Sequence, residues 1–336
     1  MADDLGWGEL EVFPGGSKHG RIETTNLNRF AEEGMQFLNA YAGYTVCAPS
    51  RTTLFTGRHS GMFPKYKLSG TSLDPGEAVT VTELLKDAGY ETALFGKSAP
   101  LNDPIGTGFD TFVGQVDQAQ CHNMYPRVIY EGPDQGNYNL SLNWKPKSRT
   151  LCMENPEEYS YTTDVFQYEA LAWLDMYHEK SRLRQLREKE SNPFFMYVSY
   201  TIPHAGGWMD TNAEQGAPVP TDGKYEYEDW PAVEKDPASV ITYMGNFVGQ
   251  LMSKLRETGI DEDTIIFFAS DNGAHLEGGT STSFLTQQEV FEATREVCLK
   301  EVIVRHPLFV GLGMFLRVRF PKHLGHSGMS FQHWLK

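Results

Sequence analysis

The sequence has little positive charge: 29 Lys and Arg residues face 44 Asp and Glu residues, and the formal net charge is -15 at pH 7. Because the phosphates of nucleic acids need a basic surface, this balance argues against a nucleic-acid partner. No apolar run approaches the ~18–20 residues that cross a bilayer, which argues against a membrane span. With 336 residues and 40% hydrophobic residues, the chain is typical of one large globular α/β domain or two smaller ones.

Cysteine is also scarce, with four residues at Cys47, Cys121, Cys152 and Cys298. Cys121 and Cys152 form a disulfide in an oxidising compartment or remain free thiols, and the sequence leaves both alternatives open. No signal peptide precedes Met1, so the chain as given does not indicate its localisation.

Cys47 opens the stretch with the clearest chemistry, Cys-Ala-Pro-Ser-Arg, which a helix-like run follows. Proline is favoured where a helix begins, and the amides there lack partners and carry the positive end of the helix dipole. Arg51 and Arg58 add fixed positive charge suited to an oxyanion. From this local chemistry alone, an anion site and a free cysteine beside a helix start are equally open.

Carboxylates occur at two further turns. Asp3 and Asp4 are adjacent and precede a glycine, and Asp271-Asn272-Gly273 follows an apolar run over 264–270. Side-chain oxygens of this kind bind hard cations such as Ca²⁺ or Mg²⁺. The alternatives are a solvated acidic turn at the first pair and an Asx turn at the second.

A lysine and a histidine follow two other predicted strands. Lys97 comes after the strand predicted over 92–95, and His204 after the apolar strand predicted over 193–200. Because α/β sheets bind ligands at the carboxyl ends of their strands, both residues are site candidates. His204 is a candidate general acid. An ordinary surface lysine and a structural histidine are the alternatives, and His122 is a further candidate to line the pocket.

The remaining pattern alternates helices with strands. It predicts helices over 26–33, 80–88 and 162–190, with Leu84 and Leu85 on the inner face of the second. A further amphipathic helix runs from Val240 to Leu255, and a strand over 35–42 leads toward Cys47. The segment 103–161 has no sustained period and is predicted to form loops over the site, where substrate choice lies.

The string C-A-P-S-R-T-T-L-F-T-G-R resembles the signature of the type I sulfatases, C-x-P-S-R followed by T-G-R. The resemblance implies an alkaline-phosphatase-like α/β/α sandwich with a mostly parallel central sheet. It also implies that a maturation enzyme oxidises Cys47 to formylglycine, whose geminal diol attacks the sulfur of a sulfate ester. The expected substrate is a sulfated small molecule or carbohydrate.

The same resemblance assigns roles to the other candidates. Arg51 orients the diol, while Lys97 and His204 contact sulfate and the leaving oxygen. His275 lies near the sulfate pocket and binds substrate. A divalent cation, Ca²⁺ or Mg²⁺, is held by Asp3, Asp4, Asp271, Asn272 and the modified Cys47.

One family feature is absent. The family lysine is often followed by Trp and His, whereas this chain has Ser98 and Ala99 after Lys97, so one expected contact to the leaving group is missing.

The resemblance extends to Phe284, which predicts a catalytic domain over 1–284. In the family an apolar first strand precedes the D-D-L-G-like turn. We therefore expect such a strand, and a signal peptide, upstream of Met1 in a full-length parent that acts outside the cytoplasm. After Phe284 the family has a Lys, a Y/F-E-G-G-x-R turn and a small carboxyl-terminal subdomain, and this chain shows none of the three patterns.

Residues 285–336 form an off-pattern tail. We back-translated this tail into permitted codons and inserted one thymidine before the codon of Leu285. The shifted reading frame then encodes F-E-G-G-Y-R and a further family-like segment. We therefore predict that the tail is read in a shifted frame and does not pack as a subdomain.

Two other functions stay open from the sequence. Phosphonate and phosphodiester hydrolases of the same superfamily share the cysteine signature, so phosphoryl transfer is the enzymatic alternative. The second alternative is a truncated product that neither folds nor turns over.

Overall fold

The structure is a computed structural model, and it describes residues 1–13, 16–17, 21–62, 71–116, 120–126, 128–132, 139–142, 160–188, 190–206, 217–274, 284 and 311–317. The α-helices are α1 (Thr25–Glu32), α2 (Cys47–Thr56), α3 (Val81–Asp87), α5 (Thr162–Gln185) and α6 (Ala232–Glu257). Short 3-10 helices are η1 (Trp7–Glu9), η3 (Ser60–Met62), η4 (Gln120–His122), η6 (Gly223–Tyr225) and η7 (Asp261–Asp263).

The strands form two sheets. The larger sheet has the order β5-β4-β3-β2-β6 and comprises β2 (Glu91–Lys97), β3 (Thr111–Gln115), β4 (Val128–Gly132), β5 (Asn139–Leu142) and β6 (Phe194–Ser199). Its strands β3, β2 and β6 are parallel, while β4 and β5 continue it antiparallel beyond β3. The smaller sheet has the order β1-β8-β7 and comprises β1 (Met35–Tyr41), β7 (Ile266–Phe268) and β8 (Gly311–Arg317).

The first three residues lie between the carboxyl ends of β6 and β7. Met1 exchanges backbone hydrogen bonds with Val198 and Tyr200, and Ala2 with Ala269 and Asp271. The bridges that Ala2 and Asp3 form with these neighbouring segments are parallel. The parallel core of the fold therefore runs from β3 through β2, β6 and residues 1–3 to the end of β7, as the α/β expectation requires.

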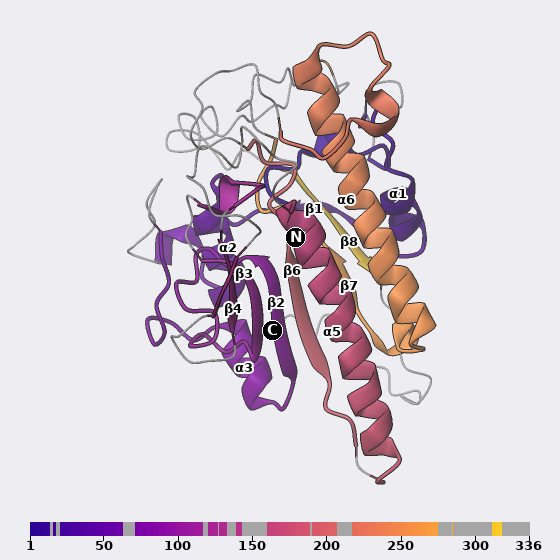
Figure 1. Cartoon of the computed structure of the whole chain (residues 1–336). Coiled ribbons are helices and arrows are strands. Elements are labelled where there is room, and N and C mark those ends of the chain that lie inside the picture. The colour runs from indigo at the N-terminus through magenta and orange to yellow at the C-terminus, as the bar shows by residue number, and fades with distance from the viewer. Residues whose placement is uncertain are drawn as a thin grey trace.

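Helices cover this core on both sides. Alternate side chains of a strand point to opposite faces, and β2 shows this directly. Its Ala93 and Phe95 pack into the cluster under α5 and α6, whereas Leu94 packs with Phe55 of α2 on the other face. Figure 1 shows α5 and α6 side by side in front of the strands. The chain is thus an α/β/α sandwich, the architecture that the resemblance implies.

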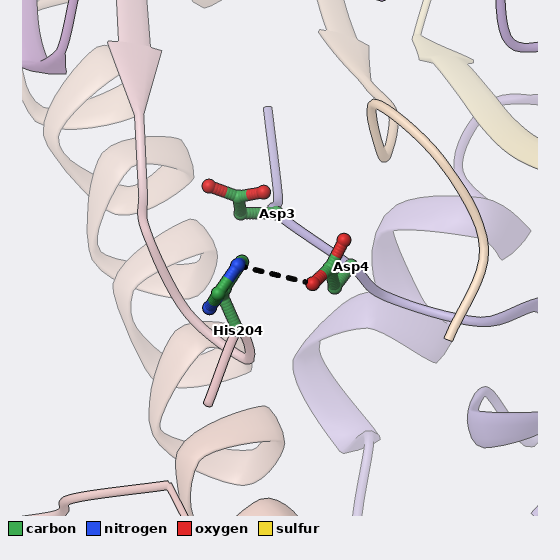
Figure 2. A group of neighbouring side chains, drawn as sticks. All are labelled: Asp3, Asp4 and His204. Atoms are coloured by element: carbon green, nitrogen blue, oxygen red, sulfur yellow. Dashed lines mark ion pairs between the residues drawn. The ribbon is translucent and has the colours of Figure 1, made fainter. Parts of the chain in front are cut away.

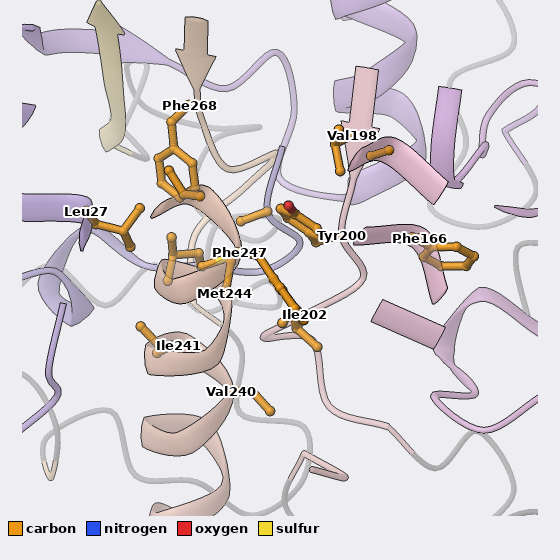
Figure 3. Close-up of a cluster of buried hydrophobic side chains, with 14 of the residues drawn as sticks. Leu27, Phe166, Val198, Tyr200, Ile202, Val240, Ile241, Met244, Phe247 and Phe268 are labelled. Carbon is orange, nitrogen blue, oxygen red and sulfur yellow. The ribbon is translucent and has the colours of Figure 1, made fainter. Parts of the chain in front are cut away.

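The helix α6 supplies one wall of the main core. Its buried positions recur at helical spacing, as predicted, and include Ile241, Met244 and Phe247. Figure 3 shows this face of α6 among Leu27, Tyr200 and other buried side chains. This packing holds α6 against the sheet and fixes the loops at the strand ends.

Most predicted elements are present, with shifted ends. The helix predicted over 80–88 is α3, which Thr80 caps in a capping box with Glu83. The prediction that Leu84 faces inward is wrong, because its side chain is 59% exposed. The segment 103–161 is not made of loops alone: β3, β4 and β5 extend the sheet there, although a run of Gly, Pro and Asn hides their short period.

The tail contributes one described strand. β8 lies between β1 and β7 and pairs antiparallel with both. Residues 285–310 and 318–336 lie outside the described residues, so the boundary at Phe284 and the shifted reading frame stay predictions.

Within the residues that the structure describes, no helix is both long enough and apolar enough to cross a membrane.

Candidate active site

The site forms where the strand ends meet the amino terminus of α2. That helix begins at Cys47 itself, two residues before Pro49, with Val46 as its N-cap and a first hydrogen bond from Ser50 N to Val46 O of 3.0 Å. The prediction that Cys47 faces a helix amino terminus is therefore correct. The helix ends at Gly57, whose positive φ of 65° suits glycine.

Only one of the two arginines reaches the site. Arg51 is one helical turn after Cys47 and lies on the same face of α2, where it is fully buried. Arg58 follows the opposite end of the helix and is exposed, so the expectation that it adds charge at the oxyanion site is wrong. A ten-residue helix separates the two ends by about 15 Å.

Asp3 and Asp4 both face the site because the backbone turns between them. Neighbouring side chains of an extended strand would point to opposite sides. Asp4 instead has a φ of 60°, in the left-handed region, which aspartate tolerates better than most residues. Such backbone strain is common at functional sites. Figure 2 shows the two carboxylates beside His204.

Three buried carboxylates meet here with two buried cationic side chains. Lys97 Nζ lies 2.6 Å from Asp3 Oδ2, and Arg51 Nη2 lies 3.5 Å from the same oxygen. Arg51 Nε donates to Asp271 Oδ2 at 2.7 Å. Asp4 N donates to Asp271 Oδ1 at 3.2 Å, which joins Asp4 to the cluster. The carboxylates outnumber the cations, so an uncompensated negative charge remains among these residues.

The pKa shifts of the two coupled aspartates run in opposite directions. Burial raises the pKa of Asp3, but the nearby Lys97 and Arg51 together outweigh it and the pKa is lowered. Burial and then the Asp3 carboxylate raise the pKa of Asp271, and the opposing effect of Arg51 does not cancel them. Of these two carboxylates, Asp271 is therefore the one whose negative charge the neighbouring side chains stabilise less.

Cys47 is completely buried at the centre of this cluster. Its sulfur, an oxygen of Asp3 and an oxygen of Asp271 lie within 4.8 Å of one another. Burial is the main cause that raises the pKa of the Cys47 thiol, so the unmodified side chain is protonated at neutral pH. A protonated thiol is a poor nucleophile, which favours chemistry at a modified side chain.

The donor set fits a hard cation. Asp3 Oδ1 and Asn272 Oδ1 are buried acceptors that have no hydrogen-bond donor in the described part of the chain. Asn272 Nδ2 donates to Asp4 Oδ1, which places the amide beside the carboxylates. Ligand atoms of Asp3, Asp4 and His204 also lie within 4.8 Å of one another. Oxygen atoms dominate, as Ca²⁺ or Mg²⁺ requires.

His204 and Lys97 lie at the same strand ends. Lys97 is completely buried at the end of β2, and the neighbouring Asp3 outweighs its burial to raise its pKa. His204 Nε2 lies 3.3 Å from Asp4 Oδ2, and its Nδ1 lies 2.6 Å from the carbonyl oxygen of Ala205. Both predicted positions are thus brought together. The predicted His275 lies outside the described residues.

The structure also places His122, the further pocket candidate, in the site. Its Nε2 lies 3.2 Å from Lys97 Nζ, and its ring stacks on His204 with centroids 3.9 Å apart. The adjacent Cys121 is a buried free thiol, whose sulfur donates to Gln115 O at 3.3 Å, so the disulfide alternative for Cys121 is wrong.

Comparison with known proteins finds similar sequences and similar folds. The N-acetylgalactosamine-6-sulfatase of Canis lupus familiaris is 29% identical over 318 residues, covering 87% of this chain and 54% of the relative. The chain thus spans about half the length of the curated relatives it matches.

Two solved structures share the fold. Ps i-CgsB in complex with k-i-k-neocarrahexaose has a TM-score of 0.65 and 23% identity, over 96% of this chain and 65% of that one. The phosphonate monoester hydrolase of Agrobacterium radiobacter has a TM-score of 0.51 and 16% identity, over 95% of this chain and 67% of that one. The family model named Sulfatase matches residues 1–311. With this match over most of its length, the chain belongs to the sulfatase family.

Proposed function

We propose that the chain hydrolyses a sulfate ester, and that a sulfated carbohydrate is its substrate class. The observation that carries the proposal is the buried convergence of Asp3, Asp271, Arg51 and Lys97 on Cys47 at a helix amino terminus. Arg51, Lys97 and the helix amides offer positive charge to a tetrahedral oxyanion of sulfur, and the carboxylates would hold a cation that adds to it. The name of the canine relative and the carbohydrate in the Ps i-CgsB complex support the substrate class.

Asp3, Asp4, Asp271 and Asn272 would hold a divalent cation, Ca²⁺ or Mg²⁺. The orphaned oxygens of Asp3 and Asn272 and the excess carboxylate charge support this assignment. When bound, the cation supplies positive charge that neutralises the sulfate oxygens during ester cleavage.

Cys47 would supply the nucleophile after a maturation enzyme oxidises its side chain to the aldehyde of formylglycine. The hydrated aldehyde provides a hydroxyl that can attack sulfur, which the buried neutral thiol cannot do equally well. Arg51 is fixed by Asp271 and by a hydrogen bond to Ser199 Oγ, so its guanidinium is held in place to orient this hydroxyl.

Lys97 and His204 would contact the sulfate and the leaving oxygen. Lys97 keeps its charge in the buried site because Asp3 raises its pKa, so its N–H groups can stabilise charge on sulfate or on the leaving oxygen. His204 donates through Nδ1 to Ala205 O, which leaves Nε2 as the nitrogen that faces the site. His204 can therefore hold or pass a proton at Nε2. The role of His275 in substrate binding stays a prediction.

Phosphonate or phosphodiester hydrolysis is the second candidate. The fold shared with a phosphonate monoester hydrolase supports it, because the same oxyanion geometry binds phosphorus esters. The sulfatase relatives favour the sulfate ester.

A paired assay tests the choice. The chain, co-expressed with a formylglycine-generating enzyme, is assayed on 4-nitrophenyl sulfate and on bis-4-nitrophenyl phosphate beside its Cys47→Ala variant. We expect sulfate hydrolysis to dominate and to disappear in the variant. Dominant phosphodiester hydrolysis, or a fully active Cys47→Ala variant, would refute the proposal.

A further inference from the structure

His122 lies at the end of η4, in the segment that follows β3, and contacts two of the residues at the strand ends. Its Nε2 lies 3.2 Å from Lys97 Nζ. Its ring is nearly parallel to that of His204, with an interplanar angle of 13° and centroids 3.9 Å apart. His122 thus touches both side chains that would meet the leaving oxygen.

The contact with Lys97 has a defined direction. An ammonium group has three N–H donors and no acceptor, so Nε2 of His122 must accept. A second N–H of Lys97 is directed to Asp3 Oδ2 at 2.6 Å. Within the described residues these two contacts account for two of the three donors. The third is then available to an oxygen of the substrate, in a direction that the other two contacts set.

The contact with His204 restrains a second group. His204 is anchored through Nδ1 to the carbonyl oxygen of Ala205, a bond about which the ring could still tilt. The stacked ring of His122 covers one face of the imidazole and opposes that tilt. Nε2 of His204 therefore keeps its direction toward the carboxylate of Asp4, 3.3 Å away.

His122 also compensates for a departure in the sequence. The sulfatase pattern has a histidine two residues after the lysine, where this chain has the buried Ala99. The imidazole beside Lys97 comes instead from His122, which is distant in sequence and reaches the lysine from the segment beyond β3.

We propose that His122 is a positioning residue for ester cleavage in this chain. It accepts one N–H of Lys97 and holds the ring of His204, so that the remaining Lys97 N–H faces the oxygen that leaves. The proposal rests on the proposed function. The effect of His122 on the rate should increase with the negative charge that develops on the leaving oxygen, because Lys97 stabilises that charge.

Two variants separate the two contacts. His122→Gln keeps an acceptor oxygen for Lys97 but loses the aromatic ring, whereas His122→Phe keeps the ring and loses the acceptor. His178→Phe on α5, away from the strand ends, is the matched control. The substrates are 4-nitrophenyl sulfate, with a good leaving group, and N-acetylgalactosamine 6-sulfate, with a poor one.

We expect His122→Phe to lower kcat on the sugar sulfate about 100-fold with little change in KM, since small misplacements of a catalytic group have effects of this size. The loss on 4-nitrophenyl sulfate should be smaller. His122→Gln should recover part of the kcat, with a remaining loss that reflects the missing ring contact with His204, and His178→Phe should match the wild type. Equal losses on both substrates, wild-type activity in His122→Phe, or no recovery in His122→Gln would overturn the proposal.

A second measurement keeps this test separate from the proposed function. In ¹⁵N NMR, the ammonium signal of Lys97 is assigned by its loss in Lys97→Arg. It should shift and exchange faster with water in His122→Phe but not in His122→Gln. A wild-type chain inactive on every sulfate would refute the proposed function alone, whereas an unchanged Lys97 signal in His122→Phe would refute the role of His122.

Discussion

The two coupled aspartates should respond in opposite ways to neutralisation in cation-free protein. The folded pKa of Asp3 is lowered, so its stabilising contribution is present above the ordinary value of 3.8 and is lost as pH falls through the lower folded value. The folded pKa of Asp271 is raised, so its contribution is present at low pH and is lost as pH rises through the raised value. At neutral pH, Asp3 therefore stabilises the fold and Asp271 does not.

The structure gives the size of the difference. Asp3→Asn leaves Lys97 buried without its carboxylate, and breaking a buried pair in this way costs about 3–5 kcal/mol. An unfolding entropy of about 2.1 cal/mol/K per residue gives about 0.7 kcal/mol/K for 336 residues. Division predicts that Tm falls by about 4–7 °C. Asp271→Asn keeps an oxygen for Arg51 and removes repulsion with Asp3, so its Tm should stay equal or rise.

In EDTA the Tm of Asp271→Asn should equal or exceed that of the wild type, and calcium should make the wild type the more stable of the two. A ligand at 100 times its Kd stabilises the folded state by about 2.7 kcal/mol, which corresponds to about 4 °C for this chain. The wild type should show this rise in Tm. Asp271→Asn should not show it, because the substitution removes a charged oxygen ligand of the cation.

Scanning calorimetry in EDTA and in CaCl₂ measures both effects. Asp87→Asn, at the exposed end of α3, is the control and should behave like the wild type in both conditions. An undiminished calcium shift in Asp271→Asn would show that the cation site is wrongly assigned. A drop in EDTA as large for Asp271→Asn as for Asp3→Asn would contradict the electrostatic reasoning.

Three further outcomes follow from burial and charge. Cys47 is completely buried, so co-expression with the maturation enzyme should convert far more of it than incubation of the folded chain, and peptide masses showing equal conversion would contradict this. Burial and the nearby Asp222 raise the pKa of Asp236 to about 7, so its stabilising contribution is lost as pH rises from near 3.8 to about 7. Asp236→Asn should flatten the fall in urea-unfolding free energy over that range, and an unchanged profile would argue against the shift. Met244→Ala, on the buried face of α6, should lower the free energy of unfolding by about 2–5 kcal/mol, measured by chemical denaturation. The exposed Met176→Ala should change by less than about 0.5 kcal/mol, and equal losses in the two variants would mean that the core is wrongly placed.

Site residues could be predicted from the sequence when a charged or titratable side chain follows an apolar strand. Lys97, His204 and Asp271 all do so, and parallel strands bring their carboxyl ends to one edge of the sheet. The buried face of α6 could also be predicted, because apolar residues at helical spacing indicate which side of the helix packs against the core.

The sequence was less informative where position depends on contacts between distant segments. His122 follows β3 in a stretch without periodicity, and only the folded chain brings it to Lys97. Arg58 matched the family string, yet the length of α2 carries it away from the site. Leu84 fitted an inward helical position, but α3 leaves it exposed because only part of this short helix contacts the sheet.

The chemical state of Cys47 and the rate of catalysis can be measured in the same samples. Preparations with graded amounts of maturation enzyme are digested, and the fraction of Cys47 peptide whose side chain has become an aldehyde is measured by mass spectrometry. Because the modified side chain would supply the nucleophile, the expected result is that sulfate-ester hydrolysis rises in proportion to this fraction and extrapolates to zero in unconverted protein. Full hydrolysis by protein in which Cys47 remains a thiol would contradict it.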